Sequence, residues 1–249
     1  MKYILSCFFV LFSTAIFSQD MFSVHQRSYQ QALKYYDYQA ATQSLYAMMV
    51  IKPEREDLKD SLANLFFAGQ RYVQAYFVSE EILKKEPGKN NIREILALSK
   101  QNLGLSKESL GDYEILWASE KKLYYLYQIC ILQYQLKRIN ECLSSLELLI
   151  SQPNAINESV NIRNQGDRSQ DVPMKAAAYN IKGICAMEMN LLDLAQSSFD
   201  LALDAFPQFE LAAANRDVVQ QQRMAQQQTS NPSTVPAETT PPSNKKKKK

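Results

Sequence analysis

The sequence of 249 residues has little glycine and almost no histidine: it contains six glycines and one histidine, His25. A chain with so few glycines forms few tight turns, which favours helices, and its length suffices for one extended domain. A Ser/His/Asp or Cys/His catalytic pair would have to use His25. The sequence also lacks a glycine-rich phosphate loop, a pair of CxxC motifs, and a His/Asp/Glu cluster at metal-ligand spacing. We therefore nominate no catalytic residue, no metal site and no cofactor, and expect neither enzymatic activity nor a small-molecule substrate.

The N-terminal segment MKYILSCFFVLFSTAIFSQ has one positive charge at Lys2, an apolar run that ends at Phe17, and then small and polar residues. The apolar run of about fifteen residues is shorter than the roughly twenty that a membrane-spanning helix needs. The pattern predicts a signal peptide over residues 1–18. We expect an exported protein of the periplasm, cell envelope or secreted fraction, without a transmembrane segment in its mature form.

The C-terminal segment, residues 229–249, is rich in Pro, Thr and Ser, has no aromatic residue, and ends in five lysines. This composition predicts disorder. Removing Lys2 and these five lysines from a chain of formal net charge +2 leaves −4, so an acidic body carries a basic tail. The tail is either an inert solvated segment or a ligand for an anionic surface. Its basic residues are Lys245, Lys246, Lys247, Lys248 and Lys249.

Two segments of the sequence, residues 41–53 and 75–87, both begin with Ala and end with Pro, 34 residues apart. The same frame fits Ala195, Phe199, Ala202 and Pro207. Apolar or small residues at steps of four, three and four lie on one face of a helix, and a proline just beyond cannot continue it. The matching ends therefore predict repeated helices that each pack through one face.

Another amphipathic stretch precedes each of these helices, with Ala63 and Gly183 as small residues where two helices would cross. Two helices joined by a short turn and repeated every 34 residues resemble the tetratricopeptide repeat family. In the last copy the match extends to Tyr179, Gly183, Ala186, Ala195, Phe199, Ala202 and Pro207.

The resemblance implies an all-α fold, an α-solenoid of about five helix-turn-helix repeats that forms a right-handed superhelix over residues 19–207. A polar stretch at residues 152–173 interrupts the repeats and is expected to be an exposed loop insertion, either functional or merely tolerated. Residues 208–228 continue as an amphipathic helix, which we expect to cap the last repeat.

The resemblance also implies a binding surface, because the first helix of each pair lines the concave face in this family. The middle of that face is acidic and its later part aromatic, and tyrosine is favoured at interfaces. The tyrosines either bind a partner or pack between repeats. The residues placed there are Asp57, Asp60, Asn64, Phe67, Glu94, Tyr124, Tyr127, Tyr134 and Asn180.

Three cysteines remain after removal of a signal peptide. In the family frame Cys130 and Cys142 occupy the two small positions where the paired helices touch. They either form a disulfide, which an oxidising compartment permits, or act as small hydrophobic residues.

These features predict a non-catalytic scaffold or adaptor of the cell envelope or periplasm that holds a peptide or helix of a partner protein in its concave face. The alternative hypothesis is a surface-tethering protein, whose lysine tail binds anionic membrane, lipopolysaccharide or nucleic acid.

Overall fold

The computed structural model describes residues 21–163 and 168–230. The predicted signal peptide and the lysine tail lie outside the described residues.

The helices follow one another in pairs joined by short turns. Residues 21–34 form the first helix and pair with α2 (Tyr38–Ile51). The next pairs are α3 (Asp57–Ala68) with α4 (Tyr72–Lys85), α5 (Asn90–Asn102) with α6 (Ser106–Glu120), and α7 (Leu123–Gln135) with α8 (Ile139–Ile150). After an insertion, α9 (Met174–Glu188) pairs with α10 (Leu192–Ala205), and α11 (Glu210–Ser230) follows. The predicted solenoid of five helix-turn-helix repeats is confirmed.

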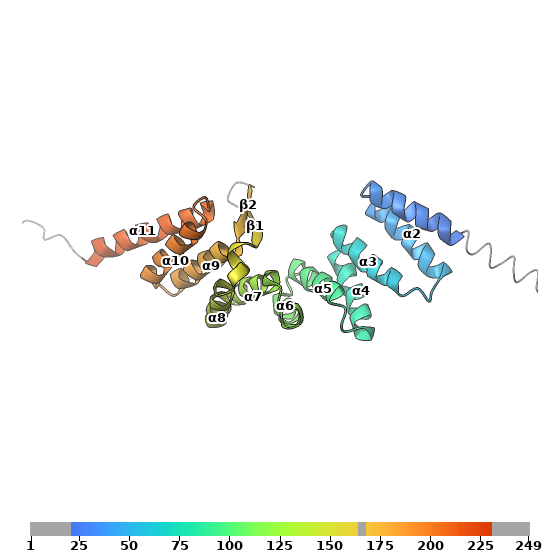
Figure 1. The fold of residues 1–249 in the computed structure, drawn as a ribbon, viewed down its shortest axis with the longest axis horizontal. Helices are drawn as coiled ribbons and strands as arrows, with labels where there is room; N and C mark the ends of the chain where they lie inside the picture. Colours follow the sequence, from blue (N-terminus) through green and yellow to red (C-terminus); the bar gives the residue numbers. More distant parts are fainter. Residues whose placement is uncertain (1–20, 164–167, 231–249) are drawn as a thin grey trace, which may run out of the picture.

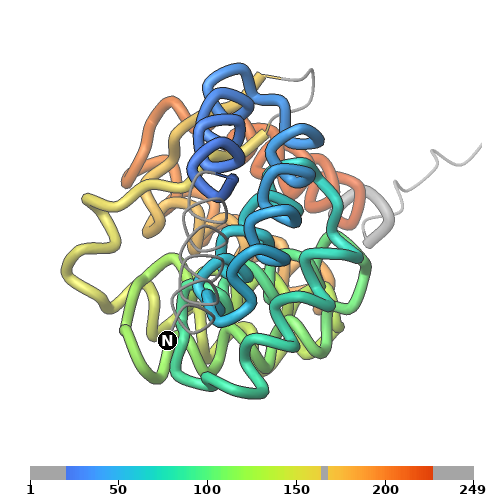
Figure 2. The backbone as a smooth tube through the Cα atoms, turned by 90° about the vertical axis from the view of Figure 1, so that its right-hand side faces the viewer, coloured from blue at the N-terminus to red at the C-terminus, as the bar shows by residue number. Residues whose placement is uncertain are grey.

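The pairs stack into an arch (Figure 1). In its middle, α3, α5 and α7 lie on the inner side of the arch, and α4, α6 and α8 lie on the outer side (Figure 1). Viewed along the long axis, the chain also winds around that axis (Figure 2). Each helix packs against the next one along the chain, so the array is held together by contacts between neighbours.

The turn inside each pair repeats one backbone conformation. One residue in each turn has a positive φ, between 55° and 77°. The amide that follows it donates to a carbonyl five residues earlier, as in Asp37 to Ala32 (2.9 Å) and Arg71 to Phe66 (2.7 Å). This is the Schellman arrangement, which satisfies the last carbonyls of the first helix and reverses the chain. The residues with positive φ are Tyr36, Gln70, Gly104, Lys137 and Asn190.

The second helix of a pair ends by a different device. Pro53, Pro87 and Pro207 each lie two residues after the last helical residue of α2, α4 and α10. Helix α6 has no such proline, and Lys121 instead takes a left-handed conformation at its C-terminus (φ 55°). Either device stops the helix and directs the chain into the next pair.

The two helices of a pair cross at small, fully buried residues. Ser109 donates its hydroxyl to the carbonyl oxygen of Ala97 at 2.8 Å across the α5–α6 crossing. In the last pair a β-carbon on Gly183 would lie 2.5 Å from the ring of Phe199. Backbones approach this closely only where no larger side chain intervenes. The small crossing residues are Ala41, Ala63, Ala75, Ala97, Ser109, Cys130, Cys142, Gly183 and Ala195.

The insertion between α8 and α9 corrects one expectation, because it is more than an exposed loop. It forms a short 3-10 helix, η1 (Pro153–Ile156), and an antiparallel hairpin of β1 (Ser159–Arg163) with β2 (Ser169–Pro173). Ala155, Val160 and Val172 are buried in the same core cluster as α7, α8 and α9. These apolar side chains hold the insertion against the repeats.

The last helix, α11, contributes Ala212 and Val219 to the core. Asp217 stands 34 residues after Gly183, at the position where a further pair would need a small residue, and its side chain is exposed. A carboxylate at that position prevents close packing of another helix. The polar outer side of α11 thus ends the array.

We predict that Gly183→Ala lowers the free energy of unfolding by about 1 to 3 kcal/mol, because the added methyl group overlaps the buried ring of Phe199. Gly111→Ala is the matched control. Gly111 lies inside α6, where a β-carbon would meet no atom within 4 Å outside the backbone of its own helix, and alanine favours helix by up to about 1 kcal/mol. Urea denaturation followed by circular dichroism measures both. Equal stability of the two variants would contradict the proposed close crossing.

Candidate functional site

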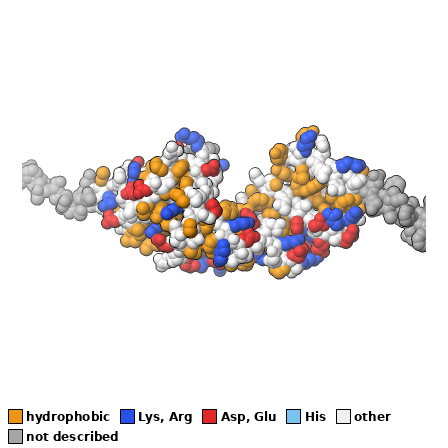
Figure 3. Space-filling view, viewed as in Figure 1, with side chains coloured by type: hydrophobic (Ala, Val, Ile, Leu, Met, Phe, Trp, Pro, Cys, Tyr) orange, Lys and Arg blue, Asp and Glu red, His pale blue; other side chains and the backbone are white. Residues whose placement is uncertain are grey.

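The inner side of the arch forms a groove between the two ends of the molecule (Figure 3). Its floor consists of α3, α5 and α7, and the β-hairpin stands at one end of it (Figure 1). We call this surface the inner groove. Its floor residues follow from the repeat frame, in which Asn64, Leu98 and Ile131 each come one residue after a crossing position.

Uncharged side chains form much of the open floor. Asn64 is exposed, and Leu98 and Ile131 are half-buried. Gln101 of α5 donates its amide to Gln128 Oε1 of α7 at 3.0 Å, a contact between neighbouring repeats. Exposed Asn102 donates to the carbonyl oxygen of Leu98 at 2.8 Å. Amide groups beside apolar side chains can bond both N–H and C=O groups of another backbone.

The acidic residues expected in the groove are paired with neighbours within the protein. Asp57 accepts two hydrogen bonds from Arg55, at 2.7 and 2.6 Å, and these bonds lower the pKa of its carboxyl. Asp60 accepts from Lys89 at 2.9 Å, and Glu94 accepts from the hydroxyl of Tyr125 at 2.9 Å. The expected acidic patch is therefore a set of ion pairs and hydrogen bonds within the protein.

Tyr127 and Asn180 do not lie open in the groove, which corrects the sequence-based assignment. Tyr127 is 7% exposed and belongs to the core cluster that includes Ala155 of η1 and Val160 of β1. Burial raises the pKa of its hydroxyl to about 12. Asn180 is 3% exposed and accepts a hydrogen bond from Asn215 of α11 at 2.9 Å.

The other expected aromatic residues join repeats to one another. Tyr134 of α7 donates its hydroxyl to Glu188 of α9 at 2.6 Å, and Lys137 pairs with the same carboxylate at 2.8 Å. Hydrogen bonds from Lys137 and then Tyr134 lower the pKa of Glu188. Half-buried Tyr124 packs against the core cluster that contains Ala97 of α5 and Tyr113 of α6.

Phe67 is half-buried and contacts Tyr72 at 5.8 Å between ring centroids. It therefore fastens α3 to α4. Of the nine residues expected to bind a partner, Asn64 is uncharged and exposed on the floor. Its amide donates to the carbonyl oxygen of Asp60 in the same helix. Four further groove residues were not predicted, although their positions in the repeat frame could have identified them. They are Gln101, Asn102, Gln128 and Ile131.

The hairpin offers a strand edge toward the groove. Gln170 of β2 bonds the backbone of the α10–α11 turn, donating to the Gln208 carbonyl and accepting from the Glu210 amide, at 2.8 and 3.2 Å. These bonds hold β2 against the α10–α11 turn, and β1 lies on the side of the hollow (Figure 1). The sheet has two strands within the described residues, so β1 is an edge strand there.

The register decides which backbone groups reach that edge. The Met174 amide donates to the Glu158 carbonyl at 2.8 Å, and bonded pairs alternate along an antiparallel ladder. Val160 is then bonded to Val172, and the N–H and C=O groups of Ser159 and Asn161 point outward. Pro173 opposite Ser159 fits this register, because proline has no N–H to donate.

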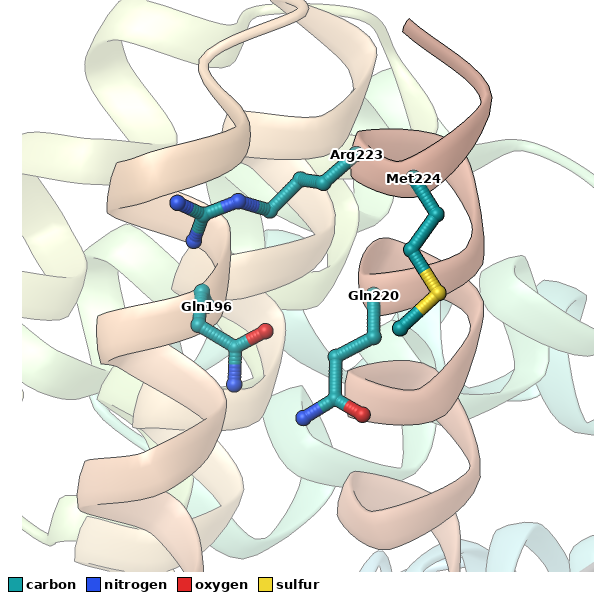
Figure 4. Close-up of a pocket in the computed structure, with 4 residues that line it drawn as sticks. All are labelled: Gln196, Gln220, Arg223 and Met224. Carbon is teal, nitrogen blue, oxygen red and sulfur yellow. The ribbon is translucent and has the colours of Figure 1, made fainter. Parts of the chain in front are cut away.

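Open cavities also lie elsewhere within the described residues. One, of about 320 Å³, lies between α10 and α11, and the side chains of Gln196, Gln220, Arg223 and Met224 extend into it (Figure 4). Arg223 forms an ion pair with Asp193 at 2.8 Å. Another, of about 570 Å³, lies beside the turns of the first two pairs and includes Tyr36, Tyr38 and Arg71.

The described residues contain no group of three or more His, Cys, Asp or Glu that could hold a metal ion. His25, the one histidine, is half-buried on the first helix. Within the same residues, no helix combines the length and the apolar character that crossing a membrane requires.

Solved structures with similar folds support this architecture. A tetratricopeptide repeat protein from Parabacteroides merdae aligns over 85% of this chain and 80% of its own, with a TM-score of 0.62 and 16% identity. The chain has the tetratricopeptide-repeat fold. YrrB, a repeat protein described as having an unusual peptide-binding site, covers 76% of this chain and 88% of its own, with a TM-score of 0.60 and 14% identity.

MamA from Desulfovibrio magneticus RS-1 covers 77% of this chain and 98% of its own, with a TM-score of 0.59 and 11% identity. No family model and no curated protein matches the sequence. The fold is thus shared with proteins in which most side chains differ.

We predict that Tyr127→Ala lowers the free energy of unfolding by about 3 kcal/mol or more, because it leaves a cavity beneath the insertion. Tyr134→Phe removes one partly exposed hydrogen bond and should cost about 1 kcal/mol or less. Chemical denaturation measures both changes. A stable Tyr127→Ala variant would show that the ring is not part of the core.

Proposed function

We propose that the protein is a non-catalytic scaffold that holds a segment of a partner protein in its inner groove. The observation that carries this proposal is the floor of α3, α5 and α7, where uncharged side chains lie open and the acidic ones are paired within the protein, beside the open edge of β1. Similarity in fold to YrrB, with its described peptide-binding site, agrees with the proposal.

The chemistry of the groove favours an extended partner segment over a helix. The Ser159 and Asn161 backbone groups can pair with an extended chain, as a third strand beside β1. A helix has already bonded its own backbone groups and could not use this edge. Leu98 and Ile131 would contact alternate side chains of the segment, while floor amides bond its backbone.

We further propose that the protein works in the periplasm or cell envelope. The proposal rests on the signal-like segment at residues 1–18. Sequencing the N-terminus of the native protein tests it: a terminus near Gln19 supports export, and a retained Met1 on the soluble protein contradicts it.

A photo-crosslinking residue placed at Asn102 or Gln128 in the full-length protein should give adducts with the partner in intact cells, because both positions line the inner groove. The same residue at exposed Glu114, on the outer helix α6, is the control and should give none. Adducts that form only from Glu114 would place the partner on the outer side and overturn the proposal.

Adding Leu98→Asp should reduce the Gln128 adduct at least about tenfold, which corresponds to about 1.4 kcal/mol of binding free energy. Val73→Asp is the matched control, since Val73 is 49% exposed on the outer helix α4. It should leave the adduct unchanged. Circular dichroism of both variants verifies folding, and equal adduct yields from folded variants would contradict binding across Leu98.

The tethering hypothesis makes the reverse prediction, because it assigns binding to the lysine tail. Deleting residues 245–249 should then abolish co-sedimentation with vesicles of anionic lipid, and wild-type binding should fall steeply with salt. The groove proposal predicts that the same deletion leaves the crosslinked adducts intact. Loss of those adducts on deletion would favour tethering.

A further inference from the structure

Three buried cysteines meet where the insertion interrupts the array. Cys130 of α7, Cys142 of α8 and Cys185 of α9 are each 0% exposed and belong to one core cluster. All three are free thiols in the structure. Cys142 Sγ lies 3.2 Å from the carbonyl oxygen of Cys130 and 3.8 Å from the sulfur of Cys185.

The contact between Cys142 and Cys130 is a regular feature of the repeat. One repeat earlier, the Ser109 hydroxyl makes the same contact with the Ala97 carbonyl oxygen, at 2.8 Å. In both pairs the second residue lies 12 positions after the first. Cys142 therefore occupies the position of a serine that donates to the neighbouring backbone. The contact uses only the backbone carbonyl of residue 130, so it does not require a cysteine there.

The contact between Cys142 and Cys185 has a different character, because it joins two successive pairs. In the repeat frame, the equivalent positions at the preceding junctions are Ala41 with Leu65, Ala75 with Ser99, and Ser109 with Leu132. Cysteine occupies both positions only at the junction of α8 and α9, among the described repeats. This is also the junction that the insertion separates in sequence.

We propose that Cys142 and Cys185 form a disulfide that locks α8 to α9 when the protein folds in an oxidising compartment. One thiolate attacks the disulfide of a donor, such as oxidised glutathione or an oxidised dithiol protein, and forms a mixed disulfide. The second thiolate displaces the donor thiol. The two cysteines lose two protons and two electrons, and the donor disulfide is reduced to two thiols.

The bond forms during folding, since the packed core excludes a donor from these sulfurs. It joins residues 43 positions apart and encloses the insertion in a covalent loop. Closing such a loop restricts the unfolded chain and stabilises the junction. The disulfide needs the oxidant of the proposed export compartment, but it does not depend on the groove or on a partner. Failure of the crosslinking experiment therefore contradicts only the groove proposal, and failure of thiol mapping contradicts only the disulfide.

The direct test is to refold the denatured, reduced full-length protein in a buffer of reduced and oxidised glutathione. Free thiols are then alkylated, and peptides are mapped by mass spectrometry without reduction. The expected result is a Cys142–Cys185 linked peptide and an alkylated Cys130. A Cys130–Cys142 link, a Cys130–Cys185 link, or three alkylated cysteines in folded protein would overturn the proposal.

The chain itself supplies matched variants that preserve packing. Cys142→Ser reproduces Ser109, Cys185→Ser reproduces Ser99, and Cys130→Ala reproduces Ala97, each at the equivalent buried position of the preceding repeats. Wild type and Cys130→Ala refolded under oxidising conditions should have a Tm about 5 to 15 °C above that of the same proteins refolded and kept in a reductant. The two serine variants should show no such shift. Loss of the shift in Cys130→Ala alone would overturn the assignment.

Discussion

The close crossing of two helices at small residues is the constraint on which the rest of the molecule depends. Ala63 with Ala75, Ala97 with Ser109, Cys130 with Cys142, and Gly183 with Ala195 bring the paired backbones together. That approach fixes the angle of each pair, and the recurrent left-handed turn fixes where the second helix begins. Repetition of one crossing then produces the arch, and the arch produces an inner surface.

The inner surface is shorter than a regular array of five pairs would provide. The insertion covers Tyr127 on α7, and α11 reaches Asn180 on α9 through Asn215. The groove is therefore bounded by the protein's own additions to the repeat, and the hairpin replaces a lost helical surface with a strand edge.

The helix pairs were predictable because Ala at the crossings and Pro after the second helices recur every 34 residues. The site was less predictable because its chemistry depends on residues outside the frame. Arg55 and Lys89 lie in the linkers that follow α2 and α4, and they neutralise Asp57 and Asp60. The hairpin had a local signal that was missed: Val160 and Ile162 alternate with polar residues, as a half-buried strand requires.

Polar contacts between repeats explain why so few side chains remain free to bind. Gln101 with Gln128, Tyr125 with Glu94, and Tyr134 with Glu188 each join one pair to the next. The stability of such an array is the sum of the stabilities of the helix pairs and of the interfaces between neighbouring pairs. Contacts across these interfaces therefore set how far one pair can tilt against another. A segment bound across α5 and α7 would touch the same amides that connect these helices. Binding at the proposed site would therefore be coupled to the stiffness of the arch, because the Gln101 and Gln128 side chains would take part in both.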